Sequence, residues 1–225
     1  MIPLRDTIPS QSFPVVNISL IIVNSLVFFL ELSLGGQLGE FISIFGVVPS
    51  RFMDSLTGGD VTGLTIVPMF TSMFLHAGWF HLIFNMLYLW IFGDNVEDAL
   101  GHFRYLLFYI LCGLGATLTH VFLSPLADVP VVGASGAIAG VLGAYLLLYP
   151  RSRVLTLVPF FFFYLVEIPA LVFLGLWFVI QFLSGLLTVG TEASAGVAWW
   201  AHVGGFLTGM ILLFPFRRRR LSHRD

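Results

Sequence analysis

Lysine is absent from this chain of 225 residues, and all ten of its basic residues are arginine. Charged residues make up only 10% of the sequence, and the net charge is −2. A broad lysine-rich surface for nucleic acid is therefore excluded, and the charge argues against a polyanionic partner. Cysteine occurs once, at Cys112, so no intramolecular disulfide is possible. Because Cys112 lies inside an apolar run, we expect a buried core thiol.

The His-Glu-x-x-His motif of helical zinc proteases is also absent. His76 and His81 are five residues apart, so on a helix of 3.6 residues per turn they would point about 140° away from each other. We therefore expect no metal site and no cofactor.

Apolar residues make up 58% of the sequence, against roughly 45–50% in soluble domains. This composition indicates an integral membrane protein that crosses the bilayer several times. We predict an all-α fold with six transmembrane helices in residues 15–216, between a short N-terminus (1–14) and a basic tail (217–225). The expected spans are 15–34, 79–99, 103–123, 131–149, 168–187 and 196–216.

Three stretches decide this count. The first apolar run is too long for a signal-peptide core and no small-residue cleavage site follows it, so we expect a retained span. Residues 35–68 are too polar to cross the bilayer and too apolar to lie in water, which favours a structured loop partly embedded in the interface. In the run 154–187, Pro159, Glu167 and Pro169 divide a short interfacial piece from the fifth span.

The arginines set the orientation. With six spans, nine of the ten arginines fall on the side that holds both termini, which is the cytoplasmic side by the positive-inside rule. Seven spans would move the four-arginine tail to the outside, so we reject that count. Basic residues that are all arginine, together with short termini, favour a bacterial inner membrane.

Four polar residues share the outer part of the bilayer in this arrangement: His81, Asn85, Ser135 and His202. Each has an ordinary interpretation when taken alone, as a packing serine, a structural histidine or an asparagine that bonds neighbouring helices. Polar groups in hydrocarbon are costly and usually face a cavity. Four at one depth therefore predict a shared pocket that contains water.

The four residue types suit acyl transfer. Ser135 opens a helix, where unpaired backbone N–H groups and the helix dipole favour an oxyanion. His81 and Asn85 lie four residues apart on one helix face and both donate hydrogen bonds. His202 would accept the proton from Ser135 and later deliver it to the leaving amine.

Small residues four apart occur on the helices of both Ser135 and His202. They are Gly136 and Gly140 on one helix, and Gly205 and Gly209 on the other. This pattern predicts close helix packing in membranes, which would let the serine meet the histidine. Glu31 and Glu167 lie only near span ends and no aspartate lies inside the apolar part of a span, so we expect a dyad rather than a triad.

Three blocks, in this order, resemble the rhomboid family of intramembrane serine proteases: His76–Met86, Gly133–Gly136, and Ala201-His202 followed by Gly205 and Gly209. The resemblance implies that Ser135 is the nucleophile and His202 the general base. It also implies an oxyanion hole made by His81, Asn85 and the backbone N–H of Ser135. Its implied partners are the lipid bilayer and single-span membrane proteins cut near the outer end of their helix. Loop 35–68 would be the partly embedded first loop, and the fifth helix a lateral gate.

Some rhomboids stack a tyrosine on the catalytic histidine, one helical turn after the nucleophile. Here that position is Ala139, so another group must orient His202, and the tryptophan–arginine pair of some first loops is not evident. Two alternatives to a protease stay open. One is a catalytically silent rhomboid-like protein that binds membrane proteins, and the other is a small transporter, which would need charged residues at mid-membrane. The sequence does not indicate an oligomeric state.

Overall fold

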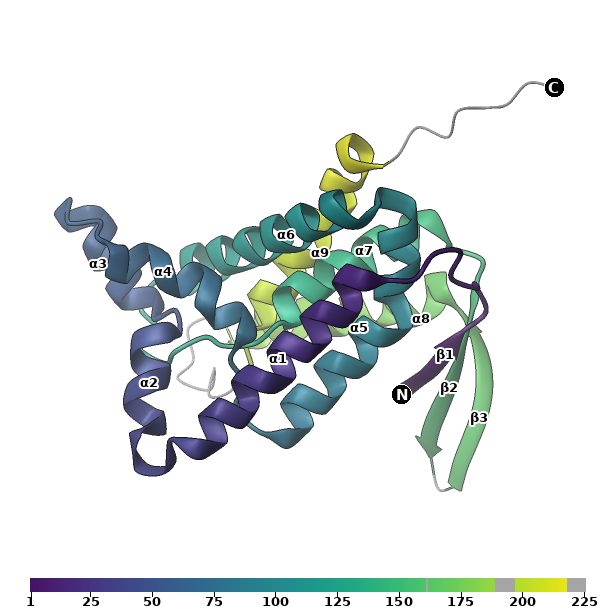
Figure 1. Cartoon of the computed structure of the whole chain (residues 1–225), viewed down its shortest axis with the longest axis horizontal. Coiled ribbons are helices and arrows are strands. Elements are labelled where there is room, and N and C mark those ends of the chain that lie inside the picture. The colour runs from purple at the N-terminus through teal and green to yellow at the C-terminus, as the bar shows by residue number, and fades with distance from the viewer. Residues whose placement is uncertain (161, 189–196, 218–225) are drawn as a thin grey trace.

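The computed structural model describes residues 1–160, 162–188 and 197–217 (Figure 1). Over these ranges the chain is mostly helical, which confirms the predicted class of an all-α membrane protein, although a small sheet accompanies the helices. Most of the predicted tail 217–225, and the first residue of the predicted span 196–216, lie outside the described residues.

In the described part of the chain, six helices correspond to the six predicted apolar segments. They are α1 (Val15–Ser33), α5 (Trp79–Leu100), α6 (His102–Leu123), α7 (Ser135–Leu148), α8 (Ala170–Thr188) and α9 (Trp199–Phe216). Most of their ends lie within three residues of the predicted ones. The largest difference is the start of α7, which begins at Ser135 rather than at Val131 because Val131 pairs with Val47 in an isolated β-bridge.

Length and hydropathy make α1, α6, α8 and α9 each able to cross a bilayer. Helix α5 also qualifies if it is joined to the preceding helices across a bend of 77°. Helix α7 has only 14 residues, fewer than the ~20 that a full crossing needs. These helices support an integral membrane protein, whereas the count of six crossings stays a prediction.

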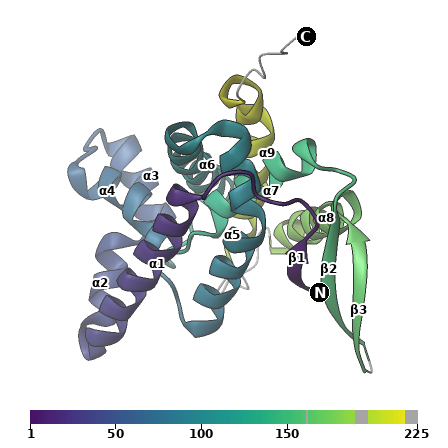
Figure 2. The ribbon, with the colours of Figure 1, turned by 45° about the vertical axis from the view of Figure 1, so that its right-hand side comes forward.

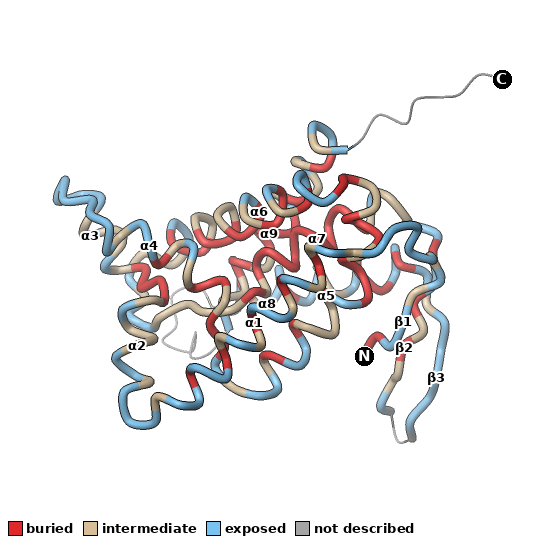
Figure 3. The backbone as a smooth tube through the Cα atoms, in the orientation of Figure 1, coloured by how far each residue is buried: buried red, intermediate tan, exposed pale blue. Residues whose placement is uncertain are grey.

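Helix α7 lies at the centre of the bundle. Its residues from Gly136 to Tyr145 are all buried, and it contacts α5, α6, α8 and α9. Figure 3 shows this buried segment between the other helices, whose outward faces are exposed. Because much of its sequence is glycine and alanine, its neighbours approach it closely without a large side chain in between.

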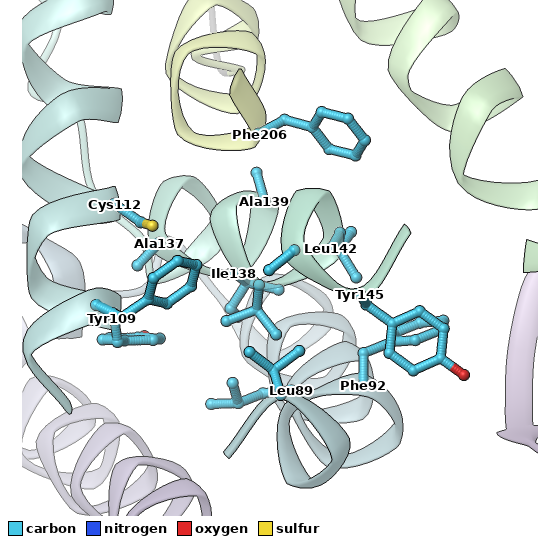
Figure 4. Packing of buried hydrophobic residues seen from close by; sticks show 14 of the residues in the cluster. Leu89, Phe92, Tyr109, Cys112, Ala137, Ile138, Ala139, Leu142, Tyr145 and Phe206 are labelled. Carbon is cyan, nitrogen blue, oxygen red and sulfur yellow. The ribbon is translucent and has the colours of Figure 1, made fainter. Parts of the chain in front are cut away.

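The buried core is arranged around α7 (Figure 4). Leu89 and Phe92 of α5, Tyr109 and Cys112 of α6, and Phe206 of α9 all belong to this cluster. Cys112 is fully buried, which confirms the expected core thiol. This packing on several sides fixes α7, and with it the position of its first residue.

The segment between α1 and α5 is folded rather than irregular. It contains η1 (Gly35–Gln37), α2 (Leu38–Phe45), α3 (Pro49–Gly58), α4 (Gly63–Thr71) and η2 (Ser72–Phe74). The carbonyl of Phe45 accepts a hydrogen bond from the hydroxyl of Thr71, and this bond ties α2 to α4. The prediction of a structured loop over 35–68 agrees with these helices.

A three-stranded antiparallel sheet was not predicted. Its strands, in the order β1-β2-β3, are β1 (Ile2–Asp6), β2 (Arg153–Phe160) and β3 (Phe162–Pro169). Strand β1 contacts α5, whereas β2 and β3 contact α8, and Figure 2 shows the sheet beside α8. The sequence predicts only a short interfacial piece in 154–167. That run is apolar almost throughout, so it lacks the alternation that marks a half-buried strand.

Candidate active site

Glycines bring α7 and α9 into backbone contact. A Cβ atom at Gly205 would overlap the carbonyl oxygen of Gly136, and a Cβ at Gly209 would overlap that of Gly140. These are the four glycines expected to pack the two helices. Their contact brings the first turn of α7 next to the first turn of α9.

Ser135 and His202 meet at this contact. Ser135 is the first residue of α7, and its Oγ lies 2.8 Å from His202 Nε2. This distance is within the range in which a histidine removes a proton from a hydroxyl nucleophile. The geometry therefore suits activation of the serine for attack on a carbonyl carbon.

The other ring nitrogen of His202 contacts helix α8. His202 Nδ1 lies 2.7 Å from Gln181 Oε1, and Gln181 is 7% exposed. A carboxamide oxygen only accepts hydrogen bonds, so it pairs with a protonated Nδ1 and leaves Nε2 free to accept from Ser135.

Two aromatic rings lie near the imidazole of His202. The ring of Trp177, from α8, lies 5.9 Å away between centroids with 38° between the ring planes. The ring of Trp199, from α9, lies 6.3 Å away and nearly perpendicular. Ala139, the position of the stacking tyrosine in some rhomboids, is buried and contributes no ring.

His81 lies on the other side of Ser135, at the start of α5. The backbone N–H of Ala77 donates to His81 Nδ1 over 3.3 Å, so the proton of a neutral ring is on Nε2. Gly133 makes room for this ring, because a Cβ at Gly133 would lie 2.7 Å from His81 Nε2 and 3.5 Å from Ser135 Oγ. Its φ of 128° also favours glycine, since other residues rarely adopt this backbone conformation. His81 Nε2 therefore lies near Ser135 Oγ as a hydrogen-bond donor.

Asn85 lies one turn further along α5. It is 7% exposed, and its Nδ2 has no hydrogen-bond partner among the described residues. Buried donors are nearly always paired, so an unpaired one needs an explanation. The backbone N–H groups of the first turn of α7, beginning at Ser135, also lack helical partners. Together these donors form a set that suits a transient negative charge.

The four polar residues line one cavity of about 800 Å³. Ser135, His202, His81 and Asn85 all contribute to it, as does Gln181. The remaining wall is largely aromatic and aliphatic, and includes Trp79, Phe80, Phe84, Tyr88, Trp177 and Leu142. The cavity therefore combines a small polar centre with walls that suit an apolar chain segment.

The two acidic candidates for orienting His202 are engaged elsewhere. Glu31 accepts the backbone N–H of His76 at 3.1 and 3.2 Å, which holds the turn before α5. Glu167 lies on β3, 3.9 Å from Arg153. In the described part of the chain, no three His, Cys, Asp or Glu side chains are grouped to hold a metal ion.

The structure brings the predicted residues Ser135, His202, His81 and Asn85 to one cavity, but the sequence patterns did not indicate Gln181. One signal was available, because Gln181 is the only glutamine in an apolar segment and polar side chains inside a span usually have a partner. The identity of that partner depends on how α8 packs against α9, which the sequence alone does not give.

Comparison with known proteins identifies the family. The sequence model of the Rhomboid domain matches residues 64–219, which include all of α5 to α9. The chain therefore belongs to the rhomboid family.

Several curated proteins are similar to this chain. RHOMBOID-like protein 6, mitochondrial, of Arabidopsis thaliana is 35% identical over 151 residues, which are 65% of this chain and 42% of that protein. Rhomboid protein 1, mitochondrial, of Saccharomyces cerevisiae is 30% identical over 149 residues, 62% of this chain and 39% of that protein. Rhomboid protease GluP of Bacillus subtilis is 41% identical over 85 residues, 38% of this chain and 16% of that protein. The matched region is thus less than half of each relative's own length.

Proposed function

We propose that this protein is an intramembrane serine endopeptidase that uses Ser135 and His202 as a catalytic dyad. The observation that carries the proposal is the 2.8 Å contact between Ser135 Oγ and His202 Nε2. Membership of the rhomboid family, and relatives named rhomboid proteases, support the same activity.

Acylation begins when Ser135 Oγ attacks the carbonyl carbon of the scissile peptide bond. His202 Nε2 accepts the proton from the hydroxyl as the Oγ–C bond forms. The carbonyl oxygen becomes an oxyanion, and Asn85 Nδ2, His81 Nε2 and the backbone N–H of Ser135 are its donors. When the C–N bond breaks, His202 returns the proton to the leaving amine and an ester of Ser135 remains.

Deacylation uses the same groups in reverse. A water molecule attacks the ester carbonyl carbon while His202 Nε2 accepts its proton. The second oxyanion collapses, the proton goes to Ser135 Oγ, and the free carboxyl terminus of the substrate leaves. The reaction consumes one water and needs no metal or cofactor.

The substrates we propose are single-span membrane proteins, cut near the outer face of the bilayer. The family supports this class, and the aromatic walls of the cavity suit an apolar segment. We further propose six crossings, with both termini and nine of the ten arginines on the cytoplasmic side of a bacterial plasma membrane.

A fluorogenic transmembrane peptide, mixed with purified protein in liposomes, tests the activity. We expect cleavage by the parent protein and none by Ser135→Ala, with unchanged thermal unfolding because only a small, partly buried hydroxyl is lost at a helix end. A Ser135→Ala protein that cleaves at the parental rate would rule out the dyad.

A serine-directed fluorophosphonate separates the protease from the silent binding protein considered as an alternative. We expect the probe to label Ser135, and to do so only when His202 is present. A folded parent protein that neither takes up the probe nor cleaves any membrane peptide would instead support the binding role.

A further inference from the structure

We propose that Gln181 is the positioning residue for the general base: it holds His202 in the productive tautomer from helix α8. This proposal rests on the proposed protease function. It starts from the 2.7 Å contact between Gln181 Oε1 and His202 Nδ1, which lies on the opposite side of the ring from Ser135.

The direction of this hydrogen bond decides whether His202 acts as a base. With the carboxamide oxygen towards the ring, the proton is on Nδ1 and the lone pair of Nε2 faces Ser135 Oγ. With the amide reversed, its NH₂ group would donate to Nδ1. The proton would then be on Nε2, and His202 could no longer accept from the serine. Gln181 thus selects one of two tautomers that differ completely in function.

Gln181 is buried, and its hydrogen bond with His202 offsets the cost of that burial. It is the only carboxamide in α8, whose other described residues are apolar except for Ser184 and Thr188. A polar side chain in such a helix is costly unless it is paired. A neutral amide also suits this position better than a carboxylate, because it orients the ring without adding a negative charge to the hydrocarbon region.

Helix α8 presents three residues at intervals of four on one face. Phe173 packs against the rings of Tyr88 and Phe92 on α5. Trp177 packs against the rings of His202 and Phe206 on α9. Gln181 then bonds the imidazole, so two successive turns of α8 contact the base.

This face of α8 holds the ring of His202, which α7 does not do. Ala139 lies one turn after Ser135 and is too small to hold the ring. Trp177 and Gln181 supply the packing and the hydrogen bond from α8 instead. The alignment of His202 therefore depends on α8 lying against α9.

Two substitutions test the role of Gln181. Gln181→Met keeps the length and volume of the side chain but removes the acceptor, whereas Gln181→Glu keeps an acceptor oxygen. We expect Gln181→Met to lower kcat about 10- to 100-fold, as loss of alignment at a base does, with little change in KM. Fluorophosphonate labelling should slow in parallel, and Gln181→Glu should restore most of both rates. Ile180→Met, at the neighbouring and exposed position on the same helix, is the matched control and should behave as the parent.

Nitrogen-15 NMR of the histidine rings measures the tautomer directly and does not depend on turnover. In the parent protein we expect His202 Nδ1 to be protonated and Nε2 unprotonated, and in Gln181→Met a mixture of both tautomers. Thermal unfolding shows whether each variant is folded.

Two results would overturn the proposal. One is a folded Gln181→Met protein with parental kcat and labelling, and the other is a parent protein whose His202 carries its proton on Nε2. If the parent neither cleaves nor labels, the proposed function fails, yet the tautomer measurement still decides whether Gln181 orients the ring.

Discussion

The two helix interfaces on either side of His202 differ in the kind of contact that they make. Between α7 and α9 the contact is backbone against backbone, at Gly136 with Gly205 and at Gly140 with Gly209. Between α8 and α9 it runs through side chains, such as the rings of Trp177 and Phe206. Ten of the 14 residues of α7 are buried but only five of the 19 in α8, so α7 is fixed on several sides and α8 mainly on one.

This difference separates two tasks. The α7–α9 interface sets the distance between Ser135 and His202. It allows almost no freedom, because a single carbon added at Gly205 or Gly209 would overlap a carbonyl oxygen. The α8–α9 interface sets the orientation of the His202 ring, through longer side chains that tolerate small movements. Changes at the first interface should therefore affect folding, and changes at the second should affect rate.

The largest effect is expected for Gly205→Val. Its side chain would overlap the backbone of Gly136 in α7, and the backbone has no way to move aside. We expect a loss of roughly 3 kcal/mol or more in the free energy of unfolding, at the upper end for an overpacked core, together with loss of fluorophosphonate labelling. Thermal unfolding in detergent measures the first and gel fluorescence the second.

Gly175→Val is the matched control, because no atom of the described residues lies within 4 Å of a Cβ at this position on α8. It should change stability by less than about 1 kcal/mol, since a small change at an open position is usually mild. If both variants unfolded at the parental temperature, the backbone contact would not hold α7 against α9.

An intermediate effect is expected for Asn85→Ala, on the α5 side of the cavity. Loss of one oxyanion donor should lower kcat by about 10²–10³ with little change in KM. Stability should stay the same or rise, because the Nδ2 that is removed is buried without a partner among the described residues. Asn24→Ala is the control: Asn24 is also buried, but its Nδ2 donates to the carbonyl of Leu20 within α1. A normal kcat for Asn85→Ala would remove this residue from the oxyanion hole.

Much of the helical fold was predictable from the sequence because hydrocarbon demands long apolar runs, and prolines mark where such runs break. The ends of α1 and α6 follow from this alone. The meeting of Ser135 and His202 was predictable because each stands beside glycines spaced for helix contact.

Other features depended on contacts between distant segments. Strand β1 pairs with β2, which comes about 150 residues later, and nothing in Ile2–Asp6 specifies that partner. The contact of Gln181 with His202 depends on the rotation of α8 about its axis, and an apolar helix that faces lipid shows no periodicity to fix it. The same holds for His81, whose tautomer depends on the backbone N–H of Ala77 in the turn before α5.

The smallest effect is expected for Gly185→Ala on α8. This substitution is also the sharpest test of the difference between the α7–α9 and α8–α9 interfaces. A Cβ at this position would lie 3.1–3.3 Å from ring carbons of Trp200 on α9, which is tight but leaves room for a shift of a few tenths of an ångström. Gln181 lies one turn away, so the shift should lengthen its bond to His202. We expect kcat to fall by about 2- to 10-fold, with less than about 1 kcal/mol lost from the free energy of unfolding. In a Gln181→Met background the same substitution should have no further effect on kcat, because the bond that it perturbs is already gone. Independent, multiplicative losses in the double variant would mean that Gly185 acts on the rate by another route.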